Sequence, residues 1–259
     1  MRIAMLTNRA GEHTHSRLQE AAASRGHDLD AINPLRCTMA IEDQALTLYH
    51  EGRPMKAYDA VIPWLSASTA EFGMAVLRQF ECMGVLPLNP SHAVAAARDK
   101  FHSLQLLVQG GAAVPATAMA HERSQAAHTV ELVGGAPAIV KLPEGRQGVG
   151  VVLADTTQSA RSVIEAFRGI KRRVLVQEFI EEAASSDIRV VVIDGEVVAT
   201  MERSGEAGEF RSNLHRGGVS KPVAITPAEH ALARRATRAA GLSLCGVDIL
   251  RSNDGPLVI

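Results

Sequence analysis

The chain has 259 residues, a formal net charge of −1 and a hydrophobic fraction of 46%, which is enough for two or three subdomains of a globular protein. This charge offers no field to attract nucleic acid or an anionic membrane, and the aromatic content of 3% argues against stacking on single-stranded nucleic acid. The three cysteines, at positions 37, 82 and 245, are scattered and fit reduced cytosolic thiols better than a zinc site. Without a signal peptide or a membrane-length apolar run, we expect a cytoplasmic protein that makes no membrane contact.

Strands and helices alternate in the first third of the sequence. We predict strands at 2–7, 27–33 and 58–63, and helices at 16–25 and 68–83. Gly26 and Gly84 follow the two helices, in the position that C-terminal caps prefer. This alternation predicts a small parallel α/β sheet up to about Pro90.

The remainder of the chain has a different organisation, with strands in hairpin-like pairs and single helices packed on them. Asp194-Gly195 is a strong hairpin signal within residues 187–200. This pattern predicts α+β lobes with antiparallel sheets. We expect helices at 91–110, 124–133, 156–168 and 226–240, and strands at 114–120, 136–141, 151–154, 173–180, 187–200, 245–250 and 256–259.

A glycine-rich loop joins two apolar segments in APAIVKLPEGRQGVGVVLA, residues 136–154. β-Branched residues on both sides predict two strands. Gly145, Gly148 and Gly150 let the backbone bring its N–H groups close to a ligand, and Lys141 on the preceding strand suits a phosphate. The loop matches neither a P-loop nor a Rossmann fingerprint, so a plain β-hairpin with a glycine turn is an equally good interpretation of the loop alone.

Two further segments carry residues suited to a nucleotide. The strand RVLVQEFI ends in Glu178 and Phe179, where a carboxylate and extended backbone could meet the ribose and adenine. Lys100, in Arg-Asp-Lys, could reach phosphates from the junction with the N-terminal part. The alternatives are a solvated strand end for the first and a charged helix surface for the second.

Cationic and acidic side chains also gather along the predicted C-terminal sheet. Alternation places Asp187 and Arg189 on one face of a strand. Arg203, Arg211 and Asn213 offer donors for phosphate or carboxylate oxygens. A solvated basic loop is the alternative interpretation of FRSNLHRGG, residues 210–218.

Asp248 lies within the apolar strand GVDIL. A buried carboxylate is unfavourable without a partner, and hard oxygen ligands hold the Mg²⁺ that accompanies nucleotide phosphates. We interpret Asp248 as a metal ligand, with a salt-bridged core aspartate as the alternative.

In order, RDK, VKLPEGRQGVGV, LVQE, DIR, ER, FRSNLHRGG and GVDIL resemble the ATP-grasp superfamily, and most closely its RimK branch. The resemblance covers essentially the whole chain. It implies an α/β N-terminal domain followed by a two-lobed α+β ATP-grasp fold. The expected divisions are 1–97 for the N-terminal domain, 98–180 for the central lobe and 181–259 for the C-terminal lobe.

The resemblance also implies an ATP-dependent carboxylate–amine ligase that forms an acylphosphate and then an amide. Its substrates would be L-glutamate and the C-terminus of the sixth small-subunit ribosomal protein, its cofactors ATP and Mg²⁺ or Mn²⁺, and its assembly a homo-oligomer. Arg203, Arg211 and Asn213 would be catalytic and Asp248 would bind the metal. Nucleotide binding would fall to Lys100, Lys141, Gly145, Gly148, Gly150, Glu178, Phe179, Asp187, Arg211, Ser212 and Asn213.

The sequence departs from the family pattern at three places. The family continues its last strand into Glu-x-Asn, whereas this sequence stops at Ile259, so we expect an incomplete C-terminal lobe with Asp248 as the metal ligand present. Trp64 begins WLSAS where an arginine followed by Ile-Gly is usual, and Ser204 replaces a second arginine. These departures leave two alternatives open: a ligase for another carrier protein, peptide or cofactor carboxylate, or an inactive nucleotide-binding module.

Overall fold

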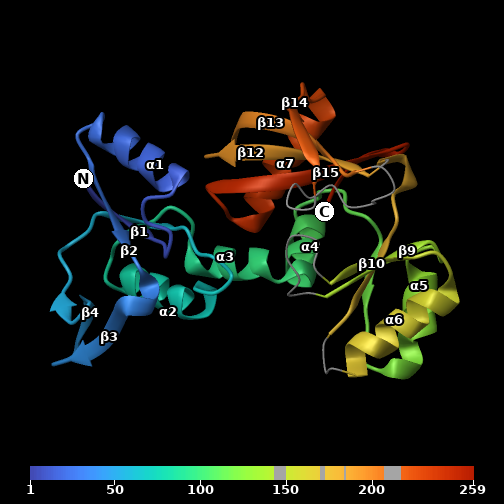
Figure 1. Ribbon diagram of the computed structural model, residues 1–259, viewed down its shortest axis with the longest axis horizontal. Coiled ribbons are helices and arrows are strands. Elements are labelled where there is room, and N and C mark those ends of the chain that lie inside the picture. Colours follow the sequence, from blue (N-terminus) through green and yellow to red (C-terminus); the bar gives the residue numbers. More distant parts are fainter. Residues whose placement is uncertain (143–149, 170–172, 184, 207–216) are drawn as a thin grey trace. The chain divides into compact units, whose positions relative to one another are not determined.

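The computed structural model describes residues 1–142, 150–169, 173–183, 185–206 and 217–259, with the backbone alone at residues 123, 168 and 169. The chain forms two compact units, residues 1–95 and 96–259, and most of their helices and strands are labelled in Figure 1. The division of the second unit after residue 180 stays a prediction. Among the described residues, none of the helices is both long and apolar enough to span a membrane.

A parallel sheet forms the centre of the first unit, as the sequence predicts. Its strand order is β2-β1-β6-β7, with β1 (Arg2–Leu6), β2 (Asp28–Ile32), β6 (Ala60–Pro63) and β7 (Leu86–Pro87). Met5 packs with α1 (His13–Ala23), whereas its neighbour Leu6 packs with α2 (Ala70–Cys82). Because neighbouring residues of a strand point to opposite faces, the two helices cover opposite faces of the sheet.

A small antiparallel sheet in the same unit is absent from the sequence-based expectations. It contains β3 (Cys37–Glu42), β4 (Ala45–His50) and β5 (Arg53–Pro54), after a short 3₁₀ turn η1 (Pro34–Arg36). The turn from β3 to β4 uses Asp43 and Gln44 at φ values of 50° and 63°. This turn lacks the glycine that makes most tight hairpins recognisable in a sequence.

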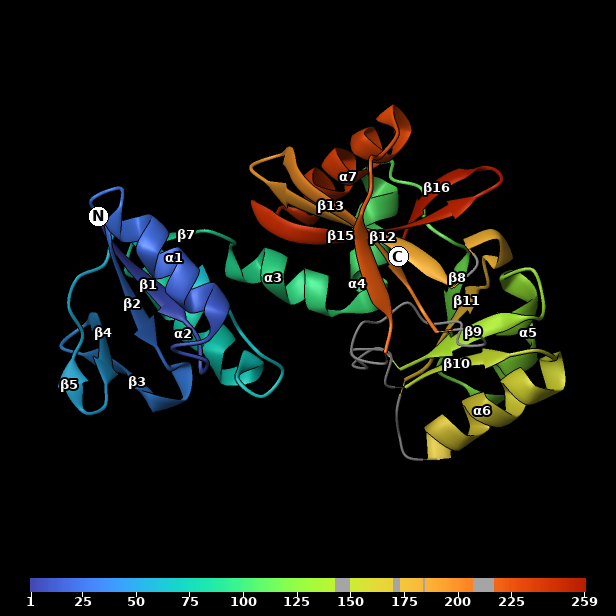
Figure 2. The ribbon, with the colours of Figure 1, turned by 45° about the horizontal axis from the view of Figure 1, so that its top comes forward.

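The second unit contains a four-stranded antiparallel sheet in the order β10-β9-β11-β8. Val140 of β9 and Val176 of β11 are buried against Val130 of α5 and Ile164 of α6. Figure 2 shows α5 and α6 together on one side of this sheet. The elements are β8 (Thr117–Met119), η2 (Arg123–Gln125), α5 (Ala126–Leu132), β9 (Ala138–Lys141), β10 (Val151–Ala154), α6 (Thr157–Gly169) and β11 (Leu175–Glu178).

A five-stranded antiparallel sheet, β14-β13-β12-β15-β16, completes the second unit. Asp194 and Gly195 join β12 to β13 with positive φ at both positions, which confirms the predicted hairpin. Ile188, Val190 and Val192 form a core with α4 and α7. The elements are α4 (Lys100–Gln109), η3 (Glu181–Ala183), β12 (Ser186–Ile193), β13 (Glu196–Ser204), β14 (Val219–Pro222), α7 (Pro227–Ala240), β15 (Leu244–Ser252) and β16 (Gly255–Val258).

The expectation of one helix over residues 91–110 is wrong. The segment forms α3 (Ser91–Arg98) and α4, separated by Asp99 in an extended conformation at φ −90° and ψ 107°. The Asp99 carboxylate accepts from the backbone N–H groups of Phe101 and His102 at 3.0 and 3.1 Å. An N-cap of this kind ends one helix and begins the next.

The N-terminus of α7 is held by a buried carboxylate. Thr226 and Glu229 form a reciprocal capping box, and Arg251 of β15 donates to both oxygens of Glu229 at 2.5 and 3.1 Å. Burial alone would raise the pKa of Glu229, but the hydrogen bonds from Arg251 and the Thr226 backbone outweigh it and lower the pKa. This ion pair therefore ties α7 to the five-stranded sheet.

Replacing Glu229 by Gln is expected to reduce the free energy of unfolding by about 2 to 4 kcal/mol, because Arg251 and the helix N-terminus lose a buried negative charge. Urea unfolding at neutral pH measures the loss. Glu196→Gln is the matched control: Glu196 also pairs with an arginine but its side chain is 67% exposed, so a change within about 0.5 kcal/mol is expected. Equal losses in both variants would contradict the structural role of the capping box.

Candidate functional site

One face of the five-stranded sheet carries a row of charged side chains. Asp187 and Arg189 lie two residues apart on β12, so both point to the same face. The register places Arg203 of β13 opposite Asp187 and Asp248 of β15 opposite Arg189. The opposite face is the apolar one that packs on α4 and α7.

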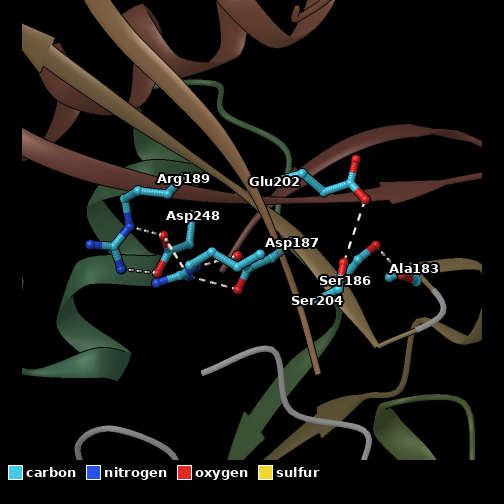
Figure 3. Close-up of polar contacts among 8 residues, drawn as sticks. Ala183, Ser186, Asp187, Arg189, Glu202, Ser204 and Asp248 are labelled. Atoms are coloured by element: carbon cyan, nitrogen blue, oxygen red, sulfur yellow. Dashed lines mark hydrogen bonds and ion pairs between the residues drawn. The ribbon is translucent and has the colours of Figure 1, made fainter. Parts of the chain in front are cut away.

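These four side chains form an alternating chain of acids and bases, and Figure 3 labels Asp187, Arg189 and Asp248 among them. Arg203 donates through Nε and Nη2 to the two carboxylate oxygens of Asp187, at 2.6 and 2.7 Å. Its Nη2 also lies 3.0 Å from Oδ1 of Asp248. Arg189 donates to both oxygens of Asp248, from Nε and from Nη2, the latter at 2.8 Å. We call Asp187, Arg203, Asp248 and Arg189 the charge network.

Burial makes the members of the charge network interdependent. The side chains of Asp187 and Arg203 are only 5% and 10% exposed. Burial works to lower the pKa of Arg203, but the carboxylates of Asp187 and Asp248 outweigh it, so the pKa is raised. A charge this buried is stable only beside a partner of opposite sign. Two carboxylates and two guanidinium groups leave the network formally neutral.

Gly246 makes room for the charge network. It lies on β15 two residues before Asp248, and a Cβ at this position would come within 2.9 Å of Cδ and 3.1 Å of Nη1 of Arg189. A glycine inside a strand commonly marks such a close approach. The sequence-based reasoning placed Arg189 beside Asp187 but did not single out Gly246, although its position within an apolar strand is the signal that could have revealed it.

A lysine occupies a different electrostatic setting on the four-stranded sheet. Lys141, at the end of β9, donates through Nζ to Oε1 of Gln177 on β11. Gln177 is buried and in turn donates to Oγ1 of Thr117 at 2.8 Å. Burial, together with the positive charge of Lys100, lowers the pKa of Lys141 to about 8. Sequence reasoning missed Gln177 and Thr117, whose roles follow from strand pairing.

The remaining predicted nucleotide contacts lie on these elements or outside the described residues. Lys100 begins α4 directly after its Asp99 cap. The Glu178 carboxylate accepts from the backbone N–H of Ala116 at 3.1 Å, and Phe179 follows it. Gly150 precedes β10 at φ 72°. The described ranges do not include Gly145, Gly148, Arg211, Ser212 or Asn213.

Asp248 is the metal ligand that the sequence predicts, and its surroundings limit how it could serve. Within the described residues, no group of three His, Cys, Asp or Glu side chains could hold a metal ion. Mg²⁺ is commonly bound by one or two protein carboxylates together with substrate phosphates. Asp248 fits such a partial site as one donor, although Arg189 and Arg203 already contact its oxygens.

Comparisons with known proteins place this geometry in context. A family model described as the RimK-like ATP-grasp domain matches residues 97–259, and a RimK PreATP-grasp domain model matches residues 1–94. The chain is 50% identical over 259 residues to a probable alpha-L-glutamate ligase of Halorhodospira halophila, covering 100% of this chain and 86% of that protein. A protein of Thioalkalivibrio sulfidiphilus with the same description is 51% identical with the same coverage.

Solved structures of ATP-grasp ligases have the same fold. A RimK domain protein ATP-grasp from Sphaerobacter thermophilus matches with a TM-score of 0.73 at 21% identity, over 100% of this chain and 89% of that one. The ATP-grasp ligase PsnB, complexed with a phosphomimetic variant of a minimal precursor, Mg and ADP, matches with a TM-score of 0.70 at 18% identity, over 100% of this chain and 88% of that one. These matches confirm the expected fold, an N-terminal α/β domain followed by an ATP-grasp fold.

The buried Asp187–Arg203 pair is expected to be strongly coupled. Arg203→Met should reduce the free energy of unfolding by about 3 to 5 kcal/mol, because it leaves the Asp187 carboxylate buried without a cation. Adding Asp187→Asn should recover part of this loss, giving a coupling of at least about 1.5 kcal/mol in a double-mutant cycle measured by urea unfolding.

The Glu202–Lys221 pair provides the matched control for this cycle. It joins β13 to β14 at 3.3 Å, but the Lys221 side chain is 69% exposed. The same cycle there should give about 0.5 kcal/mol or less. A coupling for Asp187–Arg203 no larger than that of the control would show that the charge network does not stabilise the sheet.

Proposed function

The chain belongs to the RimK-like ATP-grasp family and is an ATP-dependent ligase that forms a peptide-type bond, and we propose that it adds L-glutamate to the C-terminus of the sixth small-subunit ribosomal protein. The observation that carries glutamate as the substrate is 50% identity, over the whole chain, to a protein described as a probable alpha-L-glutamate ligase. The ribosomal acceptor rests on the ordered motifs from RDK to GVDIL, which resemble the RimK branch.

The proposed reaction has two steps. The acceptor carboxylate attacks the γ-phosphorus of ATP, which forms an acylphosphate and releases ADP. The amine of glutamate then attacks the acyl carbon, the C–O bond to phosphate breaks, and an amide and inorganic phosphate result. A neutral amine needs no protein base to attack, so the protein's task is to hold the reactants and stabilise charge.

The described residues suggest how this task is divided. Burial and, to a smaller extent, the positive charge of Lys100 lower the pKa of Lys141, and we assign both lysines to the phosphates of ATP. Glu178 and Phe179 are assigned to the nucleoside end. Arg203 is assigned to the developing charge of the acyl centre, and Asp187 holds its guanidinium in place. A ribose contact of Asp187 stays a prediction.

The metal and the predicted loops complete the proposal. A bound Mg²⁺ or Mn²⁺ would neutralise phosphate charge, with Asp248 as its ligand from the described residues. Gly145, Gly148 and Gly150 are proposed to close over the phosphates, and Arg211, Ser212 and Asn213 to contact phosphate and the reacting centre. We also propose that residues 98–180 and 181–259 act as two lobes, which follow an N-terminal domain of residues 1–97 in the sequence.

Activity with a defined acceptor tests the proposal. The full chain is incubated with ATP, Mg²⁺, L-glutamate and the ribosomal protein, and we expect release of ADP together with a gain in acceptor mass equal to added glutamate residues. Asp248→Asn should reduce turnover by about a hundredfold or more, whereas Asp254→Asn, in the exposed β15–β16 turn, should leave it unchanged. ADP release with a different carboxylate acceptor but not with this one would reject the ribosomal substrate.

The lowered pKa of Lys141 predicts a pH dependence of ATP binding. Phosphate oxygens favour the protonated amine, and the pKa of about 8 means that the free protein loses this proton in mildly alkaline solution. The ATP dissociation constant should therefore be flat below about pH 8 and rise by up to about tenfold per pH unit above it. Calorimetric titrations between about pH 7 and about pH 10 measure this profile.

The Lys141→Arg variant tests whether titration of Lys141 causes the pH dependence of ATP binding. Lys141→Arg keeps its charge throughout this range, so its profile should be flatter than that of the parent chain. Lys221→Arg, at an exposed lysine, should leave the profile unchanged. The same alkaline weakening in Lys141→Arg would show that another group is responsible.

A further inference from the structure

The parallel sheet of the first unit reverses its winding between β1 and β6. From β1 the chain passes through α1 to β2 on one side, and from β6 it passes through α2 to β7 on the other. The two helices cover opposite faces of the sheet. In open α/β sheets, ligands bind beside the carboxyl ends of the strands at such a reversal. The ligase residues assigned above all belong to the second unit, so this edge has no role in that assignment.

Two helices begin at this edge without a side-chain cap. Glu12 precedes α1 and Thr69 precedes α2, and neither side chain accepts a hydrogen bond from its own helix. The first turn of each helix therefore presents backbone N–H groups and the positive end of the helix dipole. Together these turns favour an anion, although a helix terminus alone does not make a site.

A buried histidine supplies an independent indication of a ligand. His15 lies in the first turn of α1 and is only 8% exposed. Helical side chains lean toward the N-terminus of their helix, and Nδ1 of His15 accepts from the backbone N–H of Gly11 at 3.1 Å. The proton of the neutral ring is thus on Nε2. This buried Nε2 has no hydrogen-bond partner among the residues that the structure describes.

Hydroxyl groups border the same edge from the other strand. The segment WLSAS, residues 64–68, follows β6 directly. The hydroxyl of Ser66 lies 3.1 Å from that of Ser68 and 3.0 Å from that of Thr69. Thr69 is fully buried, and Thr7, which follows β1, is only 2% exposed. Hydroxyl groups of this kind can rotate to donate to an anion without altering the backbone.

The charges nearby disfavour an anion with two negative charges. Arg9 is 3.6 Å from Glu12, and the first turn of α2 carries Glu71. These three side chains sum to one negative charge, so a phosphate dianion would meet repulsion. A carboxylate, held by neutral N–H and O–H donors, suits this environment better.

We propose that the first unit binds a substrate carboxylate at this edge, with Nε2 of His15 and the first turn of α1 as donors and the Ser66–Thr69 hydroxyl groups beside them. The identity of the carboxylate rests on the proposed function: it belongs either to free L-glutamate or to the acidic end of the acceptor chain. His15 is a binding residue in this assignment and takes no part in the chemistry.

Imidazole ¹⁵N–¹H NMR of the full chain tests the site without turnover. L-Glutamate, and separately a short peptide ending in glutamate, are titrated into protein with ¹⁵N-labelled histidine. We expect a saturable shift of the His15 Nε2 resonance, and the compound that saturates it at lower concentration identifies the source of the carboxylate. His50 is the internal control: its Nε2 is also buried and has no hydrogen-bond partner among the described residues, but it lies on β4 and should not shift.

Two variants separate binding from folding. His15→Phe should weaken binding by about tenfold or more, the effect of losing a hydrogen bond to a charged group, and His15→Gln should recover part of it by supplying an amide donor. The melting temperatures of both variants establish whether they fold. No saturable shift at His15, or an equal response to inorganic phosphate, would overturn the site even if the chain adds glutamate. A His15 shift without ligase activity would preserve the site and reject the proposed function.

Discussion

The buried carboxylate of Asp187 is the constraint on which the five-stranded sheet depends. With a side chain only 5% exposed, it requires a cation at the opposite position of β13, and Arg203 occupies it. Arg203 then contacts Asp248, and Asp248 binds Arg189. Each member is stable only because the next is present. A shift of one residue in the β12 register would turn Ile188 and Val190 away from α7 and place charges against the core. The charge network and the apolar core therefore specify the same strand pairing.

The two sheets of the second unit differ in how they balance charge. The charge network neutralises itself, whereas the hydrogen-bond partner given to Lys141 by the described residues is the neutral Gln177. Lys141 keeps a lowered pKa because burial and Lys100 both disfavour its proton. A bound anion would offset both the unfavourable burial of the Lys141 charge and its repulsion by Lys100. This difference supports binding of ATP phosphates beside Lys141, because the arginines of the other sheet are already paired with carboxylates.

Local patterns in the sequence predict much of this architecture. Alternation in DIRV places Asp187 and Arg189 on one face, and Asp194-Gly195 predicts the hairpin that aligns Arg203 with Asp187. Features that depend on distant residues were not predictable in this way. The Asp43-Gln44 turn lacks a glycine signal, Asp99 divides a sequence that is otherwise helical, and the role of Gly246 depends on an arginine 57 positions earlier. Likewise, the sequence does not reveal that Nε2 of His15 is buried without a hydrogen-bond partner among the residues that the structure describes.

Asp248 has structural partners that the apolar segment around it does not reveal. Its apolar neighbours suggested that the carboxylate had little structural purpose, yet two arginines bind it and give it one. A cation that used both of its oxygens would have to share them with these guanidinium groups or displace one of them. Arg189 is the member better able to move, because its side chain is 35% exposed and Arg203 is 10% exposed and held by Asp187. Movement of Arg189 would leave the buried Asp187–Arg203 pair intact. The network can thus release one oxygen of Asp248 without losing the interaction that fixes the sheet.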